Sequence, residues 1–338
     1  MEEKHKILPV SDVKRYSLKE RKSKVVLEIQ GKPYVEGSSF GDFLATLPSV
    51  LAARDFATAV EAIVRARDNS RPVILAMGAH PIKVGLSPVI INLMRNGTIT
   101  ALVTNGACLV HDFEMAFAGH TSEDVAEELC KGSFGMAEET GKYVNRAIVD
   151  GVNLGYGLGR SMGSFLAAGS FPSDGPSLSG GAITSGGIAK YDGVSLYAEA
   201  YRLGLPATVH VAIGTDIVHM HPEADGGAIG EGSMRDFRLL ASVVADLSGG
   251  VYINLGSAVI LPEVFLKALN LARNLGYEVE NFTAIVMDFI RQYRAETNVL
   301  RRPTMHSGKA ISLIGHHEIM FSLLAAAIIE KKGKKVWK

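Results

Sequence analysis

The stretch ITALVTNGACLVHDFEMAF (residues 99–117) decides the fold. It begins as a continuous apolar run, breaks at Asn105 and Gly106, and resumes with helical spacing around His111 and Asp112. The apolar run is too short for a buried helix and is typical of a strand that is covered on both faces. The stretch therefore predicts a buried strand that delivers a turn and a helix start to one edge of a sheet.

Five other apolar runs share this design, since each is short and ends in small or polar residues. They are PVILAMGAH (72–80), TVHVAIGTD (208–216), GVYINLGSA (250–258), TAIVMD (283–288) and AISLIGHHE (310–318). Most are followed by amphipathic helical patterns, as in residues 230–250 and 260–276. Strands that alternate with helices imply right-handed crossovers. We expect an α/β fold with a doubly wound, mainly parallel sheet and helices on both faces.

The strand ends of such a sheet form a candidate ligand site. In open α/β sheets ligands bind outside the carboxyl ends of the strands. Here the six runs end in Gly, Ser, Thr, Asn, Asp and His. Small residues let the backbone approach a ligand, and the N–H groups at helix starts suit phosphates. We therefore expect one polar edge that binds a small molecule.

The composition indicates a globular enzyme. The chain has 338 residues, with 35 Lys and Arg against 35 Asp and Glu, which gives no support for a nucleic-acid or acidic-membrane partner. No apolar run approaches the roughly 18 residues that span a bilayer. The two cysteines and the lack of a signal peptide favour a cytoplasmic location. Cys108 is either a nucleophile or a small buried residue, and the second interpretation is favoured.

The chain divides into an arm, a domain and a tail. Residues 1–35 are a charged N-terminal arm, residues 36–331 a single α/β domain, and residues 332–338 a basic tail. Residues 152–205 are rich in Gly and Ser and are expected to form a folded excursion from the sheet. Neither G-x-G-x-x-G after an apolar strand nor a P-loop pattern occurs. Upstream, HTSEDVAEELCKG (120–132) predicts a helix capped by Thr121 or Ser122.

Histidines are concentrated at the expected strand ends. Seven of the ten lie there: His80, His111, His219, His221, His306, His316 and His317. A metal site could be built from Asp216, His219, His221 and His316, because an H-x-H pair on an extended segment projects to one face. The alternative, favoured by the undiagnostic spacing, is that these side chains form hydrogen bonds or position a substrate.

A lysine and two arginines lie near the last apolar run. Arg301 and Arg302 either bind an anion or lie in solvent. Lys309 is either a surface residue or, beside a buried sheet, an amine with a lowered pKa that forms an imine with a carbonyl substrate.

Several of these stretches together resemble deoxyhypusine synthase and its uncharacterised bacterial relatives. The matching segments are KVGLSPVIINLMRNGTITALVTNGACLVHDFEMAF, AIGTDIVHMHP, INLGSAVI and SGKAISLIGHHEIMFSLLAAAI. The resemblance runs from about Arg71 to Lys331, and the Gly/Ser-rich excursion matches poorly. Each segment is weak alone, and their order makes the set moderately specific.

The resemblance implies a single NAD-binding α/β domain that works as a homotetramer. Enzymes of this family use NAD to oxidise an amine and hold the product as an imine on a lysine, here Lys309. NAD would lie along Thr104, Asn105, Gly106, His111, Asp112, Asp216, Gly256, Ser257, Ala258, His316 and His317.

The sequence also departs from the family. Ser307-Gly308-Lys309 stands where the synthases carry Trp-Gly-Lys, and His221 stands where an acid is expected. A Glu-Glu pair has become His111-Asp112. A polyamine needs carboxylates to offset its charge, and this edge has exchanged acids for histidines.

We therefore expect an NAD-dependent enzyme that acts on a different and less cationic small molecule. The enzyme would oxidise this molecule or transfer an amine or alkyl group from it. His221 or His316 would be the general base, since the unperturbed pKa of histidine is near 6.5. The alternatives are a metal-dependent hydrolase that uses the His/Asp cluster and a non-catalytic nucleotide-binding protein.

Overall fold

The computed structural model describes residues 5–168 and 189–333, and it contains one parallel sheet of six strands. All six predicted strands are confirmed, at Val73–Met77 (β1), Ala101–Asn105 (β2), Ala207–His210 (β3), Val251–Leu255 (β4), Thr283–Asp288 (β5) and Lys309–Ile314 (β6). Their order across the sheet is β3-β2-β1-β4-β5-β6, and every neighbouring pair is parallel. The predicted doubly wound α/β fold is confirmed.

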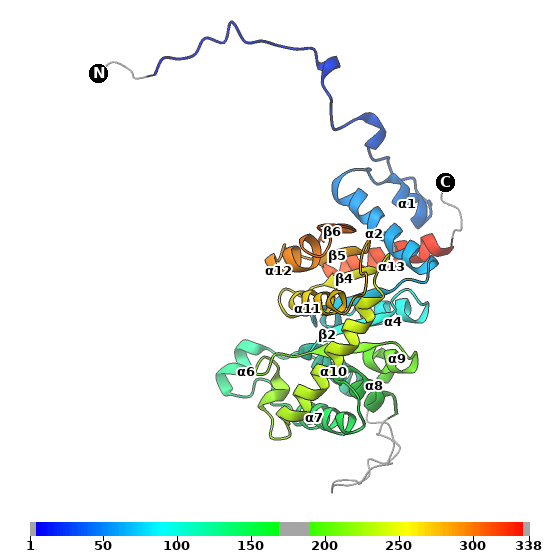
Figure 1. Cartoon of the computed structure of the whole chain (residues 1–338), viewed down its shortest axis with the longest axis vertical. Helices are drawn as coiled ribbons and strands as arrows, with labels where there is room; N and C mark the ends of the chain where they lie inside the picture. The colour runs from blue at the N-terminus through cyan, green and yellow to red at the C-terminus, as the bar shows by residue number, and fades with distance from the viewer. Residues whose placement is uncertain (1–4, 169–188, 334–338) are drawn as a thin grey trace.

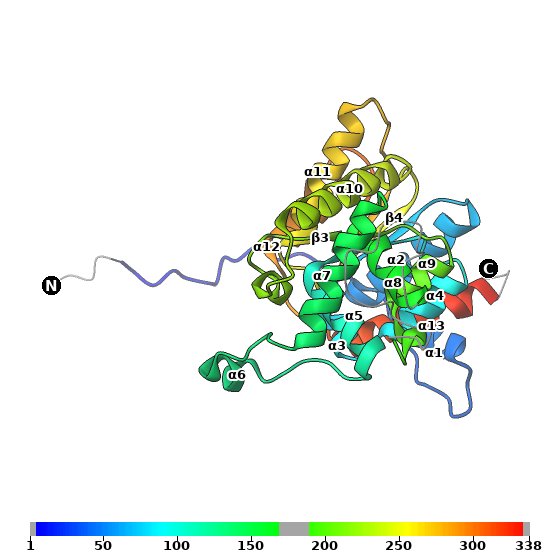
Figure 2. The ribbon, with the colours of Figure 1, turned by 90° about the horizontal axis from the view of Figure 1, so that it is seen from below.

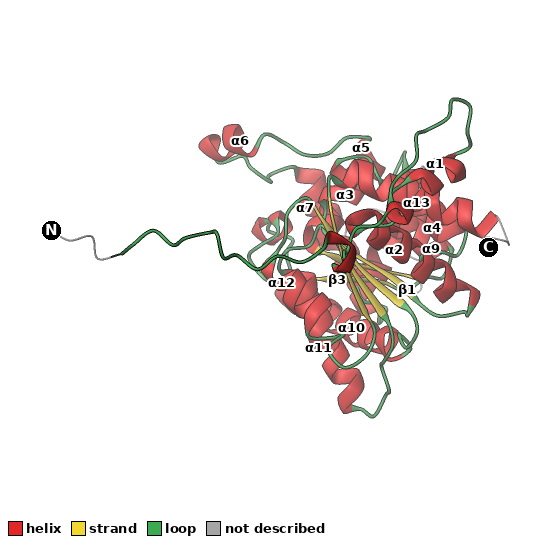
Figure 3. Ribbon diagram, turned by 90° about the horizontal axis from the view of Figure 1, so that it is seen from above, coloured by secondary structure: helices red, strands yellow, loops and turns green. Residues whose placement is uncertain are grey.

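Helices cover both faces of the sheet because its central strands are apolar on both sides. Along β1, Val73, Leu75 and Met77 enter one core, whereas Ile74 and Ala76 enter the other. Figure 3 shows the sheet between these two helical layers. The first layer contains α2 (Leu51–Asp68), α3 (His80–Lys83), α4 (Ser87–Arg95), α5 (Gly106–Ala118) and α13 (His317–Gly333). The second contains α10 (Gly226–Ala245), α11 (Ile260–Asn274) and a π-helical turn (Glu296–Arg301) after α12 (Tyr293–Ala295).

The crossover from β2 to β3 is the longest in the molecule. After α5 it contains α6 (Val125–Lys131), α7 (Glu138–Asn153), α8 (Leu158–Ala168) and α9 (Leu196–Arg202). The helix α8 lies where the sequence predicted only a Gly/Ser-rich excursion. Its glycines are packing positions, since a Cβ on Gly163 would lie 2.5 Å from the Tyr197 carbonyl oxygen. Residues 169–188 of the excursion lie outside the described residues.

Residues 119–137, the α6 segment, connect α5 to α7 and stand out from the body (Figure 2). The predicted cap of this helix was wrong, because Asp124, rather than Thr121 or Ser122, accepts hydrogen bonds from the Ala126 and Glu127 N–H groups. Thr121 is instead turned toward α5.

Residues 5–35 extend away from the body as an arm, followed by α1 (Phe40–Thr46) (Figure 1). The arm holds two short 3-10 turns, η1 (Leu18–Glu20) and η2 (Leu27–Ile29), and almost all of its side chains are exposed. The boundaries of arm, domain and tail stay predictions. Within the described residues, no helix is long and apolar enough to cross a membrane.

Candidate functional site

The strand order reverses between β1 and β4, and two glycines meet there at the carboxyl edge of the sheet. Gly78 follows β1 and Gly256 follows β4. A Cβ on Gly78 would lie 2.5 Å from the Gly256 carbonyl oxygen, and Gly256 itself has a φ of +64°. The chain therefore turns away from both strands in minimal space, and this is the place where open α/β sheets have their ligand crevice.

Two histidines and an aspartate lie beside this reversal point. His80 begins α3, and its Nδ1 lies 2.9 Å from Nδ1 of His317, which begins α13. His317 is buried, and its Nε2 lies 4.0 Å from Oδ1 of Asp288, the last residue of β5. Burial lowers the pKa of His317. Nε2 of His317 has no hydrogen-bond partner among the described residues.

Small residues follow β4 at the same place. Ser257 is buried, and its hydroxyl accepts a hydrogen bond from the Leu261 N–H at the start of α11. Ala258 is half-buried and Val259 is exposed. This part of the edge therefore presents Ala258 and Val259, whereas Ser257 is packed against the start of α11.

The end of β2 is more closed than a phosphate-binding turn. The Thr104 hydroxyl is buried and lies 2.6 Å from the Tyr197 hydroxyl, and the Asn105 side chain caps α5. Gly106 begins α5, and the carboxylate of Asp216 occupies the space that a Cβ on Gly106 would fill. Oδ2 of Asp216 is buried and unpartnered among the described residues. The protein's own carboxylate thus lies at this helix start, which favours negative charge.

Asp112 points away from the edge into the core. Its carboxylate accepts hydrogen bonds from the Ser195 hydroxyl (2.5 Å) and the Leu196 N–H (2.7 Å), and so holds the start of α9. Burial raises the pKa of Asp112 to about 6. Cys108 is also buried, and burial raises the pKa of its thiol well above the ordinary value, which agrees with the favoured interpretation of a packing residue.

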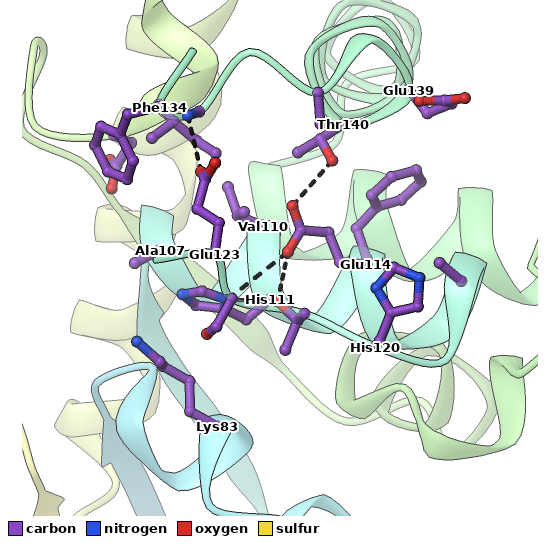
Figure 4. Close-up of a pocket in the computed structure, with 18 of the residues that line it drawn as sticks. Lys83, Ala107, Val110, His111, Glu114, His120, Glu123, Phe134, Glu139 and Thr140 are labelled. Carbon is purple, nitrogen blue, oxygen red and sulfur yellow. Dashed lines mark hydrogen bonds and ion pairs between the residues drawn. The ribbon is translucent and has the colours of Figure 1, made fainter. Parts of the chain in front are cut away.

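A cavity of about 580 Å³ lies next to this edge, between α5, the α6 segment and the loop after β3. Its walls are largely apolar, from Val110, Phe113, Phe117, Phe134 and Ile217. Figure 4 shows Glu114 and His111 on one side of it and Lys83 reaching toward His111. The remaining ionisable residues that line it are His120, Glu123, Glu139 and Asp216. Since α3 begins with His80 and ends with Lys83, one short helix connects the crevice and the cavity.

The remaining predicted histidines do not form one common site. Nδ1 of His219 accepts hydrogen bonds from the Gly214 N–H (3.1 Å) and the Asp216 N–H (3.4 Å). Nε2 of His221 lies 2.8 Å from the Gly135 carbonyl oxygen, so it carries the donated proton. His316 is exposed just before α13. Across residues 5–168 and 189–333, no group of three His, Cys, Asp or Glu is arranged to hold a metal ion.

Lys309 lies at the amino-terminal end of the strands, opposite the carboxyl edge where the other predicted residues lie. It is the first residue of β6, paired with Thr283 at the start of β5, and it is exposed. The carboxyl end of β6 is five residues away, or about 17 Å along the strand. Within this chain the structure does not bring Lys309 to the crevice.

Three residues gain importance that the sequence did not assign to them. His80 and Asp288 were noticed only as strand ends, and their approach to His317 depends on the order of strands. Glu114 escaped notice although it lies one helical turn after His111, and this i, i+3 spacing was its signal.

Comparison with known proteins supports the fold. No family model and no curated protein matches the chain. Among solved structures, a "putative deoxyhypusine synthase" from Entamoeba histolytica has 12% identity and a TM-score of 0.50, covering 89% of this chain and 97% of that one. A "conserved putative LOR/SDH protein" from Methanococcus maripaludis S2 has 16% identity and a TM-score of 0.49, covering 92% and 75%.

A third structure is AgrE in a ternary complex with ornithine and NAD⁺, with 16% identity and a TM-score of 0.47. It matches over 84% of this chain and 34% of AgrE, so the chain spans about a third of the length of that protein. The likeness to the Entamoeba histolytica structure shows the fold alone, which is a parallel six-stranded sheet surrounded by helices.

Proposed function

We propose that this chain is an NAD-dependent enzyme that oxidises an amine substrate, or transfers an alkyl group from it, at the carboxyl edge of its sheet. The observation that carries the proposal is the strand order β3-β2-β1-β4-β5-β6 with Gly78 and Gly256 in contact where the order reverses. Parallel sheets of this order bind dinucleotides in the crevice at that point. The sequence resemblance to deoxyhypusine synthase suggests the same cofactor.

The residues at the reversal point fit a dinucleotide. Ser257 and Ala258 are small, the His317 ring packs against Gly256, and the unpartnered Nε2 of His317 is a buried polar atom that a bound group would satisfy. These residues would hold the cofactor, and NAD would supply a hydride acceptor there. The adjoining cavity would hold the substrate.

The His80–His317 pair is suited to moving a proton. Because burial keeps the pKa of His317 low, its imidazole is neutral near pH 7, and a single proton lies between the two Nδ1 atoms. Asp288 lies nearest the other nitrogen of His317, and His80 is exposed to solvent. The pair would therefore carry a proton between the crevice and water.

The predicted catalytic roles of His221, His316 and Lys309 stay predictions. His316 is adjacent to His317 at the reversal point, so it is the best placed of the three. The predicted homotetramer also stays a prediction, and a partner subunit is what would bring Lys309 toward a crevice.

Calorimetric titration with NAD⁺ tests the proposal. We expect saturable binding to the wild type and its loss in Ala258→Glu, which places a negative charge beside the expected pyrophosphate. The matched control is Ala310→Glu, the same change at an exposed position near the opposite edge of the sheet. Equal effects of the two substitutions, or no binding by folded wild-type protein, would remove the cofactor from the proposal.

The geometry does not favour the other two hypotheses equally. A metal-dependent hydrolase has no support from the described residues, because no three of their His, Cys, Asp or Glu side chains are arranged to hold a metal ion. A non-catalytic nucleotide-binding protein has the same crevice, and formation of NADH from any amine in a substrate panel would exclude it.

A further inference from the structure

A hydrogen-bonded relay fixes the imidazole of His111 at the wall of the cavity. Glu114 accepts a hydrogen bond on each carboxylate oxygen, from the Thr140 hydroxyl (3.0 Å) on one and from the Thr121 hydroxyl on the other. The Thr121 oxygen lies 2.7 Å from Nδ1 of His111. The relay thus links the Glu114 carboxylate and the His111 imidazole, both on α5, through the Thr121 hydroxyl. Figure 4 shows Glu114, His111 and Thr140 at this wall of the cavity.

The relay determines which nitrogen of His111 carries the proton. A threonine hydroxyl has one proton, and that of Thr121 is donated to Glu114. The Thr121 oxygen must therefore accept from Nδ1–H of His111. Nε2 is left with its lone pair, and it makes no hydrogen bond to any described residue.

The surroundings keep this nitrogen available as a base. Burial lowers the pKa of His111, Lys83 lowers it further, and Glu114 opposes both effects. The other ionisable groups that line the cavity are His120, Glu123, Glu139 and Asp216. An imidazole with a lowered pKa is neutral at pH 7, so the Nε2 lone pair is free to accept a hydrogen bond from a substrate.

We propose that His111 is the general base that deprotonates the amine of the substrate in this cavity, with Thr121 and Glu114 as positioning residues. Nε2 of His111 forms a bond to a proton of the substrate ammonium group, the N–H bond breaks, and the amine keeps the electron pair. His111 becomes an imidazolium whose Nδ1–H still points to Thr121. This inference rests on the proposed function for the identity of the substrate as an amine.

The test uses the full chain labelled with ¹⁵N in its histidines. His111→Gln assigns the signal, and we expect the wild type to show the Nδ1–H tautomer. Thr121→Val replaces the hydroxyl by a methyl group and should leave His111 with both tautomers populated. The matched control is Thr215→Val, another threonine at the cavity wall, whose hydroxyl bonds to the Ala212 carbonyl oxygen and not to His111.

A simple amine then probes the lone pair. n-Butylamine in large excess should shift the wild-type His111 signals, and in Thr121→Val the shift should be smaller. An Nε2–H tautomer in the wild type would overturn the proposal, as would His111 signals that n-butylamine leaves unchanged. These readouts need no cofactor, so a failure of NAD⁺ binding would remove the proposed function while the tautomer result still decides the state of His111.

Discussion

The carboxylate of Asp216 covers Gly106, the first residue of α5, and occupies the volume where any larger side chain would begin. Asp216 comes from the loop after β3 and Gly106 from the end of β2, so the contact joins two neighbouring strand ends. Burial raises the pKa of Asp216. A Cβ at position 106 would therefore displace this carboxylate, which brings a negative charge to a helix start without a phosphate.

Gly106→Ala should therefore destabilise the protein by about 1–3 kcal/mol, the usual effect of overpacking. Urea denaturation measures the change, and Gly106→Ala combined with Asp216→Ala should recover part of it. Gly230→Ala is the control, because a Cβ there meets nothing within 4 Å in the helix α10. That substitution should stabilise by about 0.4–1 kcal/mol. A neutral Gly106→Ala would mean that Asp216 does not lie over α5.

Asp112 should make stability depend on pH in an unusual direction. Its pKa is raised to about 6, so the folded protein binds the proton more tightly than the unfolded chain does. The contribution of Asp112 to the free energy of unfolding should then fall as pH rises from about 4 to about 6, by a total on the order of 2–3 kcal/mol, and stay level above that. Buried Asp236, whose pKa is raised to about 7, adds a fall of the same sign. Asp112→Asn should therefore show a smaller fall than the wild type, whereas the exposed control Asp246→Asn should match the wild type. Parallel pH profiles for wild type and Asp112→Asn would contradict the buried placement of this carboxyl.

The fold was predictable because strand identity is local. The run before Asn105 and the five like it are apolar, short and followed by turns, and all six are strands in the structure. The glycines of α8 misled the prediction because their reason is tertiary: Gly159 and Gly163 allow α8 to approach β3 and α9. Helix propensity alone penalises such residues, and only the packed neighbours explain them.

The candidate site was less predictable because it depends on strand order. The position of His317 at a strand end could be read from the sequence, but its pairing with His80 requires that β1 lie next to β4 and that α13 begin nearby. Asp112 is the opposite case, since it was predicted to lie at the site and lies in the core instead. It follows His111 directly, and the rotation of one residue along α5 turns it from the cavity to the start of α9.

Gly256→Ala should disturb His317 specifically. The φ of +64° is strained for alanine, and the new Cβ would lie 2.6 Å from Cε1 of His317. Gly276→Ala is a matched control, since Gly276 also has a positive φ, +90°, but meets nothing within 4 Å. Both should lose about 1–2 kcal/mol from backbone strain. Only Gly256→Ala should lose more than this and weaken NAD⁺ binding in calorimetry, and equal behaviour of the two would exclude the crevice as the cofactor site.

Lys309→Ala should leave NAD⁺ affinity unchanged. The side chain is exposed at the start of β6, about 17 Å along the strand from the carboxyl edge where the cofactor is proposed to bind. Its removal should also change the free energy of unfolding by less than about 0.5 kcal/mol, as is usual for an exposed residue. Titration of the variant beside the wild type, with the oligomeric state of both measured by light scattering, gives the answer. Weaker binding by a Lys309→Ala protein of unchanged assembly would show that this lysine reaches the crevice of another subunit, because within one chain the sheet separates the two.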